Sequence, residues 1–572
     1  MSKNLITHQL KNLPSNTSIL QLLAKARNDG PITNNTIDEI AAKHSLPPAW
    51  VRATAQFYDT LDPQAKQHLV QCCDGEACRA ARGDEVKQQI KNESKKNVGS
   101  ITCIGLCGHA PAAMVENHPI SLADKKSYES LVNYLKTGTP IQSNTPTYNH
   151  YTRPKPAVHL LLPKLSPPNT DITIEKHHYH VLKNIAGTQT PEQLREQIHV
   201  SQLRGRGGAG FPTAIKLDTV ANSPVKDGSN RRFVVINGDE GDAGSYIDKE
   251  LMESAPHLVL EGALLAAYGV NATAIYIYIR HEYPQANQNM QLALKQIEES
   301  PILATNSSSG IINCPIHIIR GEGAYVCGEE TSLLRSIEGL PAQVSIRPPY
   351  PAQVGLYGCP TAVQNVETIC NLPIIFEHGA KYYAGVGSEK SRGTKLVSLN
   401  SAVLRPGLYE AEFGVSLSTI ILDWAGGLPK GRTIQAVQIG GPLGAILPPE
   451  LLDTPFSFEG LAQAGGTLGH GSIVVYDDRV DLLAIAQGLF TFAAKESCGK
   501  CFPCRLGSTR GEELLRDMRA DGISSEKLQL LDDLNETLEV GSLCGLGGML
   551  PTPIKSLLRF FPHLWSVDGD KR

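Results

Sequence analysis

The spacing of apolar residues changes along the chain and divides it into stretches with different expected structures. Over residues 18–62 apolar side chains recur every three or four positions, as at Ile37, Ile40 and Ala41, which predicts a small amphipathic helical bundle. Three short apolar runs then predict strands, at 68–73, 99–104 and 112–115. Residues 138–170 are rich in Pro, Thr, Ser and Asn and poor in residues that build a core, so we expect an extended linker there.

The second half of the chain alternates between strand and helix before it becomes wholly helical. Between 171 and 380, strand-like runs at 232–236, 272–279 and 316–320 are separated by residues at helical spacing, which predicts an α/β domain. Between 381 and 474, short strands are separated by glycine-rich turns, which predicts a β-rich module. Residues 475–572 return to helical spacing. The sequence therefore predicts a multidomain α/β protein.

Composition and charge argue against several classes of function. Of the 572 residues 41% are apolar and 19% are charged, and the net charge is −4. This balance, without a basic stripe interleaved with aromatic residues, gives no reason to expect nucleic acid or an acidic membrane as a partner. Residues 1–13 contain no apolar signal segment, and the most apolar long stretch, 258–270, is too short to span a bilayer. We expect a cytoplasmic protein without direct membrane insertion.

A glycine-rich loop at 204–210 carries the first sign of chemistry. Its four glycines, Gly205, Gly207, Gly208 and Gly210, leave the backbone almost bare, so several N–H groups could face one phosphate at the start of a helix. The side chains of Arg204, Arg206 and Lys216 are expected to add positive charge. The loop predicts a site for a phosphorylated cofactor.

The same letters match the G-x-G-x-x-G motif of nicotinamide-binding Rossmann domains, but the context differs. That motif follows a strand, whereas residues 190–203 have a proline near a helix start and apolar residues at helical spacing. A Rossmann unit is therefore disfavoured. A flexible surface loop remains the alternative.

Polar residues follow two of the predicted strands of the α/β domain, where open α/β sheets place their ligands. The residues after the first strand are Asn237, Asp239, Glu240 and Asp242. Those after the second are Tyr325, Gly328, Glu329 and Glu330. No nucleophile or histidine accompanies the paired carboxylates, so binding of a hydroxylated ring system fits better than acid–base catalysis. A solvated acidic turn is the alternative.

Eight of the thirteen cysteines fall into two groups of four, which in a reducing compartment favours metal over disulfides. The first group has the spacings C-x4-C and C-x3-C and lies at the ends of predicted strands: Cys73, Cys78, Cys103 and Cys107. This arrangement suits a [2Fe–2S] cluster, with zinc as the rival. Cys72 is interpreted as a non-ligand.

The second group of cysteines has three members at two-residue intervals and a remote fourth: Cys498, Cys501, Cys504 and Cys544. This pattern is typical of a [4Fe–4S] site. Zinc or a disulfide remains possible.

Five motifs together resemble one known family: RGRGGAGFPT, NGDEGDAGSY, GEGAYVCGEE, PTAVQNVET and ESCGKCFPCR. They are similar to the flavin- and NADH-binding subunits of respiratory complex I, a family that includes the diaphorase subunits of NAD-reducing hydrogenases and the β subunits of NAD-dependent formate dehydrogenases. Residues 18–137 resemble the thioredoxin-like [2Fe–2S] subunit. The resemblance implies a bundle and [2Fe–2S] domain at 1–137, a linker at 138–170, an FMN- and NAD-binding domain at 171–380, a β-grasp-like module at 381–474 and a helical [4Fe–4S] domain at 475–572.

The resemblance also implies which residues hold each cofactor. FMN is expected at Gly205, Gly207, Gly208, Lys216, Asn237, Asp239, Glu240, Tyr325, Gly328, Asn365 and Thr368, with Arg206, Gly210, Glu329 and Gln364 beside them. The nicotinamide nucleotide is expected at Phe211, Asp242, Glu330, Arg347 and Tyr350. Glu240 and Glu330 are expected to tune the flavin. The chain departs from the family at Gln364, where Asn is usual, and at Thr219, where an aromatic residue is common.

Within the family the chain is most similar to formate dehydrogenase β subunits, on the phrases GRTIQAVQIGGPLGAILP and ESCGKCFPCRLGSTRG. This resemblance implies that a molybdenum- or tungsten-containing α subunit oxidises formate and that electrons then pass through iron–sulfur clusters and FMN to NAD⁺. The alternatives are the diaphorase subunit of an NAD-reducing hydrogenase, the NADH-oxidising subunit of complex I, and a zinc-stabilised scaffold without redox activity.

Overall fold

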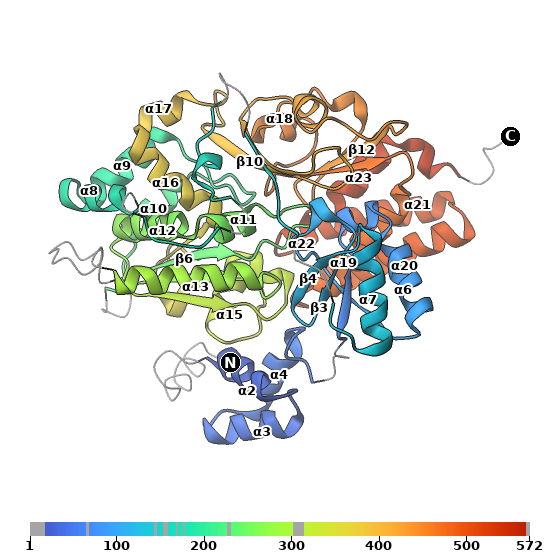
Figure 1. Cartoon of the computed structure of the whole chain (residues 1–572), viewed down its shortest axis with the longest axis horizontal. Coiled ribbons are helices and arrows are strands. Elements are labelled where there is room, and N and C mark those ends of the chain that lie inside the picture. Colours follow the sequence, from blue (N-terminus) through green and yellow to red (C-terminus); the bar gives the residue numbers. More distant parts are fainter. Residues whose placement is uncertain are drawn as a thin grey trace.

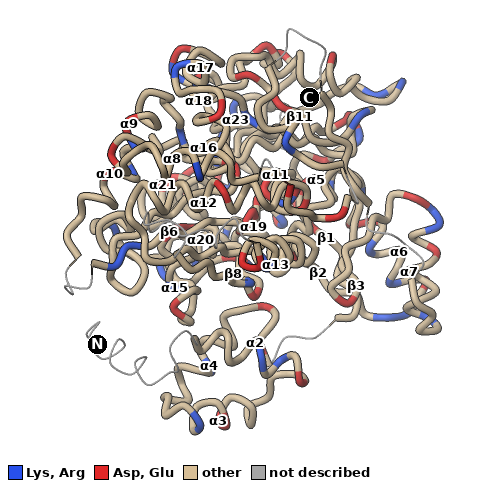
Figure 2. The backbone as a smooth tube through the Cα atoms, turned by 60° about the vertical axis from the view of Figure 1, so that its left-hand side comes forward, with Lys and Arg blue, Asp and Glu red and all other residues tan. Residues whose placement is uncertain are grey.

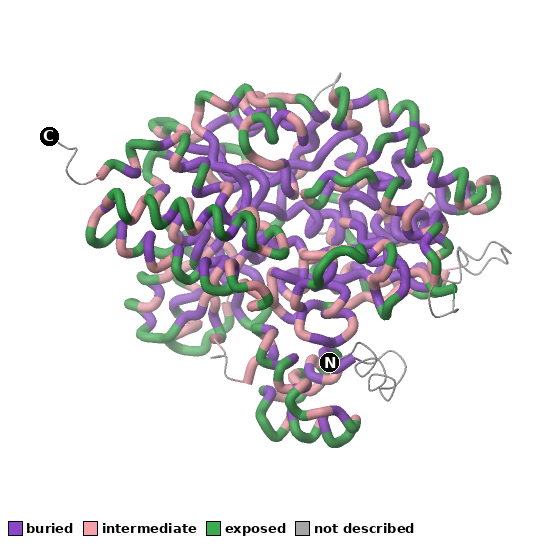
Figure 3. The backbone as a smooth tube through the Cα atoms, turned by 180° about the vertical axis from the view of Figure 1, so that it is seen from behind, coloured by how far each residue is buried: buried purple, intermediate pink, exposed green. Residues whose placement is uncertain are grey.

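The computed structural model describes residues 18–63, 68–141, 146–152, 158–167, 170–175, 178–225, 230–300 and 314–567 (Figure 1). The expectation for residues 1–13 lies outside these ranges. An α/β domain and a C-terminal helical domain lie on opposite sides of the molecule in Figure 1, with a β-rich layer above and a small helical bundle below. Buried residues form a continuous interior through the large parts, whereas the bundle is mostly exposed or intermediate (Figure 3).

The N-terminal bundle confirms the amphipathic pattern of the sequence. Its helices are α2 (Ile19–Asp29), α3 (Asn34–Lys43) and α4 (Pro48–Phe57). Ser18 and Thr33 begin α2 and α3 as N-caps, each in a reciprocal capping box. The bundle is attached to the α/β domain by the Tyr58 hydroxyl, which donates to the Leu340 carbonyl at 2.9 Å and lies 3.0 Å from Ser336 Oγ.

The next domain has the four-stranded sheet expected from its short apolar runs, in the order β2-β1-β3-β4. Its strands are β1 (Val70–Cys73), β2 (Gly99–Ile101), β3 (Ala112–Val115) and β4 (His118–Ser121). Its helices are α5 (Glu76–Ala80), α6 (Gly83–Ser94) and α7 (Lys125–Thr137). β1 runs parallel to β2 and antiparallel to β3, and the first two cysteines lie at the end of β1 and in α5.

The α/β domain is built on a fully parallel sheet in the order β8-β7-β6-β9. Its strands are β6 (Phe233–Gly238), β7 (Ala274–Ile279), β8 (Ile316–Arg320) and β9 (Thr361–Asn365). Its helices are α8 (His180–Thr188), α9 (Pro191–Ser201), α10 (Thr213–Asn222), α11 (Ile247–Ser254), α12 (Pro256–Val270), α13 (Pro284–Glu299), α15 (Glu330–Ile337), α16 (Val366–His378) and α17 (Ala380–Gly385). Parallel strands place all their carboxyl ends at one edge, and there the loops predicted to bind cofactors meet.

The β-rich module is a six-stranded mixed sheet in the order β13-β12-β14-β10-β11-β5. Its elements are β5 (His150–Tyr151), β10 (Thr394–Leu399), β11 (Gly407–Glu412), β12 (Ile434–Ile439), β13 (Ile446–Leu447), α18 (Phe458–Gln463) and β14 (Ser472–Asp477). β14 crosses the boundary expected at 474, because the strand continues to Asp477.

The expectation of a separating linker at 138–170 is wrong for the parts that the structure describes. β5 pairs parallel with β11 as an edge strand of the six-stranded sheet. Tyr148 and residues 160–162 are buried, and the carboxylate of Glu410 accepts backbone N–H groups of Leu160, Leu161 and Leu162. The polar composition did not indicate that this segment belongs to the folded domain. The reason is that backbone and carboxylate hydrogen bonds, rather than apolar side chains alone, hold the segment in place.

The C-terminal domain is helical, as predicted. Its helices are α19 (Leu482–Glu496), α20 (Phe502–Asp521), α21 (Ser525–Gly541), α22 (Gly545–Gly548) and α23 (Pro551–Phe560). No helix of the described residues combines the length and apolar character needed to cross a bilayer. Basic and acidic residues are interspersed in the view of Figure 2.

Candidate functional site

The glycine-rich loop lies at the carboxyl edge of the parallel sheet, between two helices. α9 precedes it and α10 begins directly after it, so the helical context that argued against a Rossmann unit is confirmed. Gly208 and Gly210 have φ of +123° and +61°, which glycine adopts without strain. A Cβ on Gly207 would lie 2.9 Å from Asn365 Cβ, so this position needs a bare backbone for close packing.

The arginine side chains of this loop do not provide the expected charge for a phosphate. Arg206 is fully buried, and its guanidinium donates to the Tyr383 hydroxyl at 2.8 Å and to the Arg392 carbonyl at 2.7 Å. Arg204 forms an ion pair with Glu459 at 2.5 Å. Both side chains therefore fix the loop to neighbouring segments, and that part of the expectation is corrected. The bare backbone and the start of α10 remain for an anion.

The loops after β6 and β8 join each other through backbone and amide contacts. Asn237 Nδ2 donates to the Gly328 carbonyl at 2.8 Å, and its Oδ1 accepts the N–H of Asp239 at 3.1 Å. Burial raises the pKa of Asp239 to about 8. Tyr325 donates its hydroxyl to Asp242 Oδ1 at 2.8 Å, which ties the second loop to the first again. The predicted residues of these two loops are thus brought together.

Glu240 is fully buried and holds the start of α11. Its Oε1 accepts the N–H groups of Ile247 at 2.7 Å and Asp248 at 3.1 Å, and its Oε2 accepts that of Lys249 at 3.0 Å. A carboxylate at a helix N-terminus satisfies N–H groups that have no partner within the helix. The structure gives Glu240 this anchoring role, and its expected effect on the flavin stays a prediction.

Glu330 lies between two cations at the outer side of the site. Lys216 Nζ is 3.5 Å from Glu330 Oε2, and Arg347 Nη1 donates to Glu330 Oε1 at 3.2 Å. The neighbouring Glu329 instead caps α15, accepting the N–H groups of Thr331 and Ser332 at 2.9 and 3.0 Å. The two acids that looked paired in the sequence therefore have different tasks.

Two aromatic side chains predicted for the nicotinamide nucleotide lie at an exposed rim. Phe211 is 49% exposed and Tyr350 is 53% exposed, with the Arg347 guanidinium 5.9 Å from the Tyr350 ring. Exposed aromatic faces beside charged side chains are suited to stacking on a planar ligand. Thr219, by contrast, uses its hydroxyl on the Ile215 carbonyl of its own helix.

The turn from β9 into α16 provides a test of whether a flavin nucleotide fits. Gln364 is buried, and its amide nitrogen finds no hydrogen-bond partner among the described residues. Thr213 Oγ1, at the first position of α10, is likewise buried and without a partner there. Buried polar groups are normally paired, so unpaired donors beside a bare glycine loop fit a polar ligand such as FMN. Thr368 fixes the loop by accepting the Arg206 N–H at 2.7 Å.

The first four cysteines are buried together where the small domain meets the α/β domain. Cys103 Sγ and Cys107 Sγ are 3.5 Å apart, and Cys107 Sγ accepts the N–H of Gly244 at 3.2 Å. Hydrogen bonding with Cys73 and burial raise the pKa of Cys78 well above its usual value. Four thiols buried side by side fit the donor set of an iron–sulfur cluster, because iron keeps its ligands as thiolates. Cys72 packs in a separate apolar cluster with Val70.

The second four cysteines are held by helix ends. Cys501 is the N-cap of α20, Cys504 lies in its first turn and Cys544 is the N-cap of α22, while Cys498 lies in the turn after α19. Burial raises the pKa of Cys504 and Cys544. Helix N-termini favour negative charge, so these positions suit the thiolates of a cluster.

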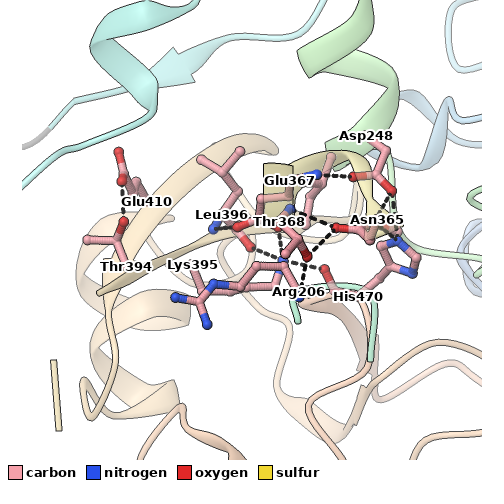
Figure 4. A network of polar contacts seen from close by, with 12 residues as sticks. Arg206, Asp248, Asn365, Glu367, Thr368, Thr394, Lys395, Leu396, Glu410 and His470 are labelled. Carbon is pink, nitrogen blue, oxygen red and sulfur yellow. Dashed lines mark hydrogen bonds and ion pairs between the residues drawn. The ribbon is translucent and has the colours of Figure 1, made fainter. Parts of the chain in front are cut away.

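Sequence reasoning missed a group of residues behind the predicted pocket (Figure 4). Figure 4 shows Asp248 from α11, Lys395 from β10 and His470 from the turn before β14 joined to Asn365 and Glu367 by hydrogen bonds and ion pairs. His470 is flanked by Gly469 and Gly471, and nothing in this stretch of sequence indicates chemistry. These residues are far apart in the chain, so no local spacing could have grouped them.

Three family models match the chain in the expected places. They are described as Nuo51 FMN-binding domain at residues 198–374, NADH-ubiquinone oxidoreductase-F iron-sulfur binding region at 484–567, and thioredoxin-like [2Fe-2S] ferredoxin at 6–136. The matches confirm the flavin domain, both kinds of cluster and the thioredoxin-like fold inferred from the motifs.

Individual proteins match over most of the chain. An NADH-quinone oxidoreductase subunit of Rhizobium meliloti is 37% identical over 67% of this chain and 90% of its own length. NADP-reducing hydrogenase subunit HndC of Solidesulfovibrio fructosivorans is 36% identical over 71% and 82%. Among solved structures, a chain of NAD⁺-reducing [NiFe]-hydrogenase in the H₂-reduced state aligns with a TM-score of 0.84 and 30% identity, over 96% of this chain and 91% of that one.

Proposed function

The chain belongs to the family of flavin- and NADH-binding subunits that includes the NADH-quinone oxidoreductase subunit of Rhizobium meliloti, and on that premise we propose that it is the β subunit of an NAD-dependent formate dehydrogenase. It is a diaphorase-type subunit of an NAD-dependent oxidoreductase, with FMN, a [2Fe–2S] and a [4Fe–4S] cluster as its cofactors. The formate-oxidising partner, which would carry molybdenum or tungsten, is the proposed part.

FMN, when bound, can accept or donate electrons two at a time, as in hydride transfer, or one at a time, as iron–sulfur clusters do. It would therefore link the nicotinamide nucleotide to the clusters. We propose that the glycine loop and the start of α10 hold its phosphate, since their N–H groups and the helix dipole favour an anion. Gln364 and Thr213 would satisfy their unpaired buried atoms on the same nucleotide. Phe211 and Tyr350 would receive the nicotinamide nucleotide at the rim, with Lys216 and Arg347 balancing the charge of Glu330.

The observation that carries the electron-transfer function is the meeting of the polar loops with the first cysteine group. The loop after β6 contributes Asp242 to the pocket and, two residues later, the Gly244 N–H to Cys107 Sγ. A cluster at these cysteines would therefore be linked to the pocket by a few covalent bonds and one hydrogen bond.

An exposed apolar surface beside the second cysteine group is suited to the partner subunit. Phe502 is 73% exposed and directly follows Cys501, Val540 is 81% exposed, and Leu543 directly precedes Cys544. Leu506 adds to it at 58% exposure. Large exposed apolar side chains around a redox centre are typical of a docking face, and we propose that the electron-supplying subunit docks here.

The formate assignment is supported by the phrase GRTIQAVQIGGPLGAILP, which spans β12, its glycine turn and β13, and by residues around the second cysteine group. A hydrogenase diaphorase is the second candidate, because the NAD⁺-reducing [NiFe]-hydrogenase chain aligns over 96% of this chain. Eight of the thirteen cysteines cluster in two groups suited to iron–sulfur clusters, which supports a reducing, cytoplasmic location as part of the proposal.

Anaerobic purification of the native complex tests the proposal. We expect molybdenum or tungsten in the complex and formate-dependent reduction of NAD⁺. Nickel in the complex with H₂-dependent NAD⁺ reduction would instead establish the hydrogenase candidate. The chain alone should oxidise NADH with an artificial dye; a flavin-loaded chain without this activity would contradict the diaphorase assignment itself.

A further inference from the structure

One histidine, His470, lies beside the segment that follows β6, and each of its ring nitrogens faces a carboxylate; Figure 4 shows its contact with Asp248. His470 Nε2 is 2.8 Å from Asp248 Oδ2, and its Nδ1 is 3.3 Å from Asp242 Oδ2. The histidine belongs to the β-rich module, whereas both acids belong to the α/β domain. It therefore enters the site from outside the domain that contains the predicted cofactor residues.

Each ring nitrogen of His470 lies within hydrogen-bond distance of a carboxylate oxygen, and Nε2 also lies 3.1 Å from the Asn365 amide nitrogen. Asp248 Oδ2 also accepts Asn365 Nδ2 at 2.6 Å, and its Oδ1 accepts the Glu367 N–H at 3.2 Å, so this carboxylate acts as an acceptor only. Asp242 likewise accepts the Tyr325 hydroxyl on its other oxygen. A neutral imidazole has one donor, whereas the imidazolium has two. The shorter contact of Nε2 is to the Asp248 carboxylate, so the imidazolium is the form that donates to both carboxylates.

The charges around the ring agree with this state. Burial by itself would lower the pKa of His470, but the ion pairs with Asp248 and Asp242 outweigh it and raise the pKa well above the usual value. Glu240 is buried nearby and accepts three backbone N–H groups as a carboxylate does, although burial raises its pKa. Lys395 is a neighbouring cation, whose Nζ donates to the His470 carbonyl at 2.8 Å and is paired with Glu367.

The histidine also completes a continuous chain of hydrogen bonds across the pocket. On one side Arg206 N–H donates to Thr368, whose N–H donates to Asn365 Oδ1 at 3.1 Å, and Asn365 donates to Asp248. On the other side stand Asp242 and the Tyr325 hydroxyl. His470 joins the two halves. The first half orients the glycine loop predicted for FMN, and the second orients an acid predicted for the nicotinamide nucleotide.

We propose that His470 is a positioning residue of the redox site, which as an imidazolium fixes Asp242 against Asp248 and lends a positive charge to an otherwise acidic pocket. This charge favours the more negative, reduced form of the flavin, and the fixed Asp242 favours binding of the nicotinamide nucleotide. The inference rests on flavin and nucleotide binding in this pocket and is independent of the partner subunit.

A metal ion is the competing interpretation of the same side chains. Glu240, Asp248 and His470 each place one ligand atom within 4.8 Å of the others. However, both oxygens of Glu240 accept N–H groups of α11, and His470 bridges two carboxylates. The ligand atoms of this group are therefore already engaged with one another and with the backbone.

Two variants of the flavin-loaded chain separate charge from orientation. His470→Gln keeps a polar side chain but removes the charge, whereas His470→Lys keeps a charge without the imidazole geometry. His199→Gln is the matched control, because His199 also pairs with a carboxylate, Asp218 at 2.6 Å, but on the surface. A unit charge within about 10 Å, at an effective dielectric constant of about 20, changes an equilibrium about tenfold.

The readouts are the flavin midpoint potential and the NADH–dye kinetics. We expect His470→Gln to shift the oxidised-to-reduced equilibrium about tenfold, a potential about 30 mV more negative, and to raise KM for NADH several-fold. His470→Lys should keep the potential but share the higher KM, and His199→Gln should match the wild type. Wild-type values of both quantities in His470→Gln would overturn the proposal, and equal potential shifts in both variants would overturn the role of charge.

If the variants lose flavin, a measurement on the wild type tests whether His470 is an imidazolium. In the oxidised protein with ¹⁵N-labelled histidine, one imidazole should stay doubly protonated above the pH range in which histidines of ordinary pKa, about 6.5, lose their proton. Its absence would refute the proposal, and a stoichiometric extra metal would favour the metal interpretation against it. Failure of the wild type to bind FMN or oxidise NADH would instead remove the proposed function.

Discussion

A buried ion pair joins the α/β domain to the β-rich module, and its removal should weaken the flavin site. Lys395 of β10 and Glu367 of α16 are both fully buried, and the Lys395 ammonium is hydrogen-bonded to the Glu367 carboxylate (Figure 4). Glu367 Oε1 also accepts the Leu396 N–H at 2.9 Å. Lys395→Met removes the cation and leaves the carboxylate without its charge partner in a site that water does not reach.

The expected cost follows from the burial of both partners. Breaking a buried pair on one side typically costs about 3–5 kcal/mol, whereas a surface pair contributes about 0–1 kcal/mol. The matched control is Lys164→Met, which breaks the Lys164–Glu377 pair at 2.6 Å, where the two side chains are 30% and 35% exposed. The double variant Lys395→Met/Glu367→Gln should recover most of the loss, because no unpaired charge remains and the amide oxygen still accepts from Leu396.

The loss of stability in Lys395→Met should also depend on pH, and it should grow as the pH rises. Burial raises the pKa of Glu367, and Lys395 offsets part of this effect. Without Lys395 the folded-state pKa rises further, so the folded variant binds a proton that the unfolded chain has released above a pKa of about 4.3. Stability is therefore lost as the pH rises from that value toward the raised folded pKa, by about 1.4 kcal/mol per pH unit.

The assay is the rate at which FMN is released at a fixed temperature, at pH 6 and pH 8, for the single, double and control variants. We expect Lys395→Met to lose FMN much faster than Lys164→Met, with the larger difference at pH 8. If Lys395→Met released FMN at the same rate as Lys164→Met, or if the difference between them were as large at pH 6 as at pH 8, an unpaired buried carboxylate could not be the cause of faster FMN release.

Three further predictions concern the cofactor sites. Gly207→Ala should weaken FMN binding by about 5- to 150-fold, the equivalent of about 1–3 kcal/mol of overpacking, because the added Cβ would lie 2.9 Å from Asn365 Cβ. The control is Gly187→Ala, where an added Cβ meets no described atom within 4 Å. FMN affinity is measured by fluorescence titration, and equal affinities of the two variants would contradict the close packing at Gly207. Cys504→Ser should abolish the low-temperature EPR signal of the reduced [4Fe–4S] cluster while the [2Fe–2S] signal stays, and loss of both or neither would count against the assignment of the two groups. Phe502→Asp should abolish co-purification of the partner subunit without changing NADH–dye activity, since it charges an apolar side chain that is 73% exposed; an intact complex would rule out this face.

The sequence predicted the elements well where apolar spacing was regular. β3 and β8 have the bounds that their apolar runs indicated, and α9 lies where helical spacing placed a helix before the glycine loop. The cysteine groups were also predictable, because most ligands of each cluster lie in short spacings. The predictions of these elements and of the cysteine groups both use patterns within about ten neighbouring residues, which is the range over which apolar periodicity can be recognised.

The sequence misled where a polar residue serves the fold. Arg206 looked like a source of positive charge for a phosphate, yet its guanidinium is buried and donates to Tyr383. Glu329 stays a predicted cofactor contact, but the sequence did not show that its carboxylate also caps α15. The segment 146–152 looked like a linker, yet it contains β5. A charged residue within a motif shows which kind of group its side chain can bind. Which group it does bind depends on tertiary contacts that no local sequence pattern encodes.

The same limit explains why the β-rich module looked unrelated to the chemistry. Its strands showed no ligand motif, and its histidine in a glycine turn had no companion nearby in the chain. In the folded protein the module places Lys395 and His470 beside Glu367, Asp248 and Asp242 of the α/β domain, next to residues predicted to bind the flavin. Three carboxylates converge there, and their mutual repulsion in a buried site requires cations from another element. The module thus supplies positive charge to the acidic side of the α/β domain, and changes to its buried cations should affect the redox site although neither cation is itself a predicted cofactor ligand.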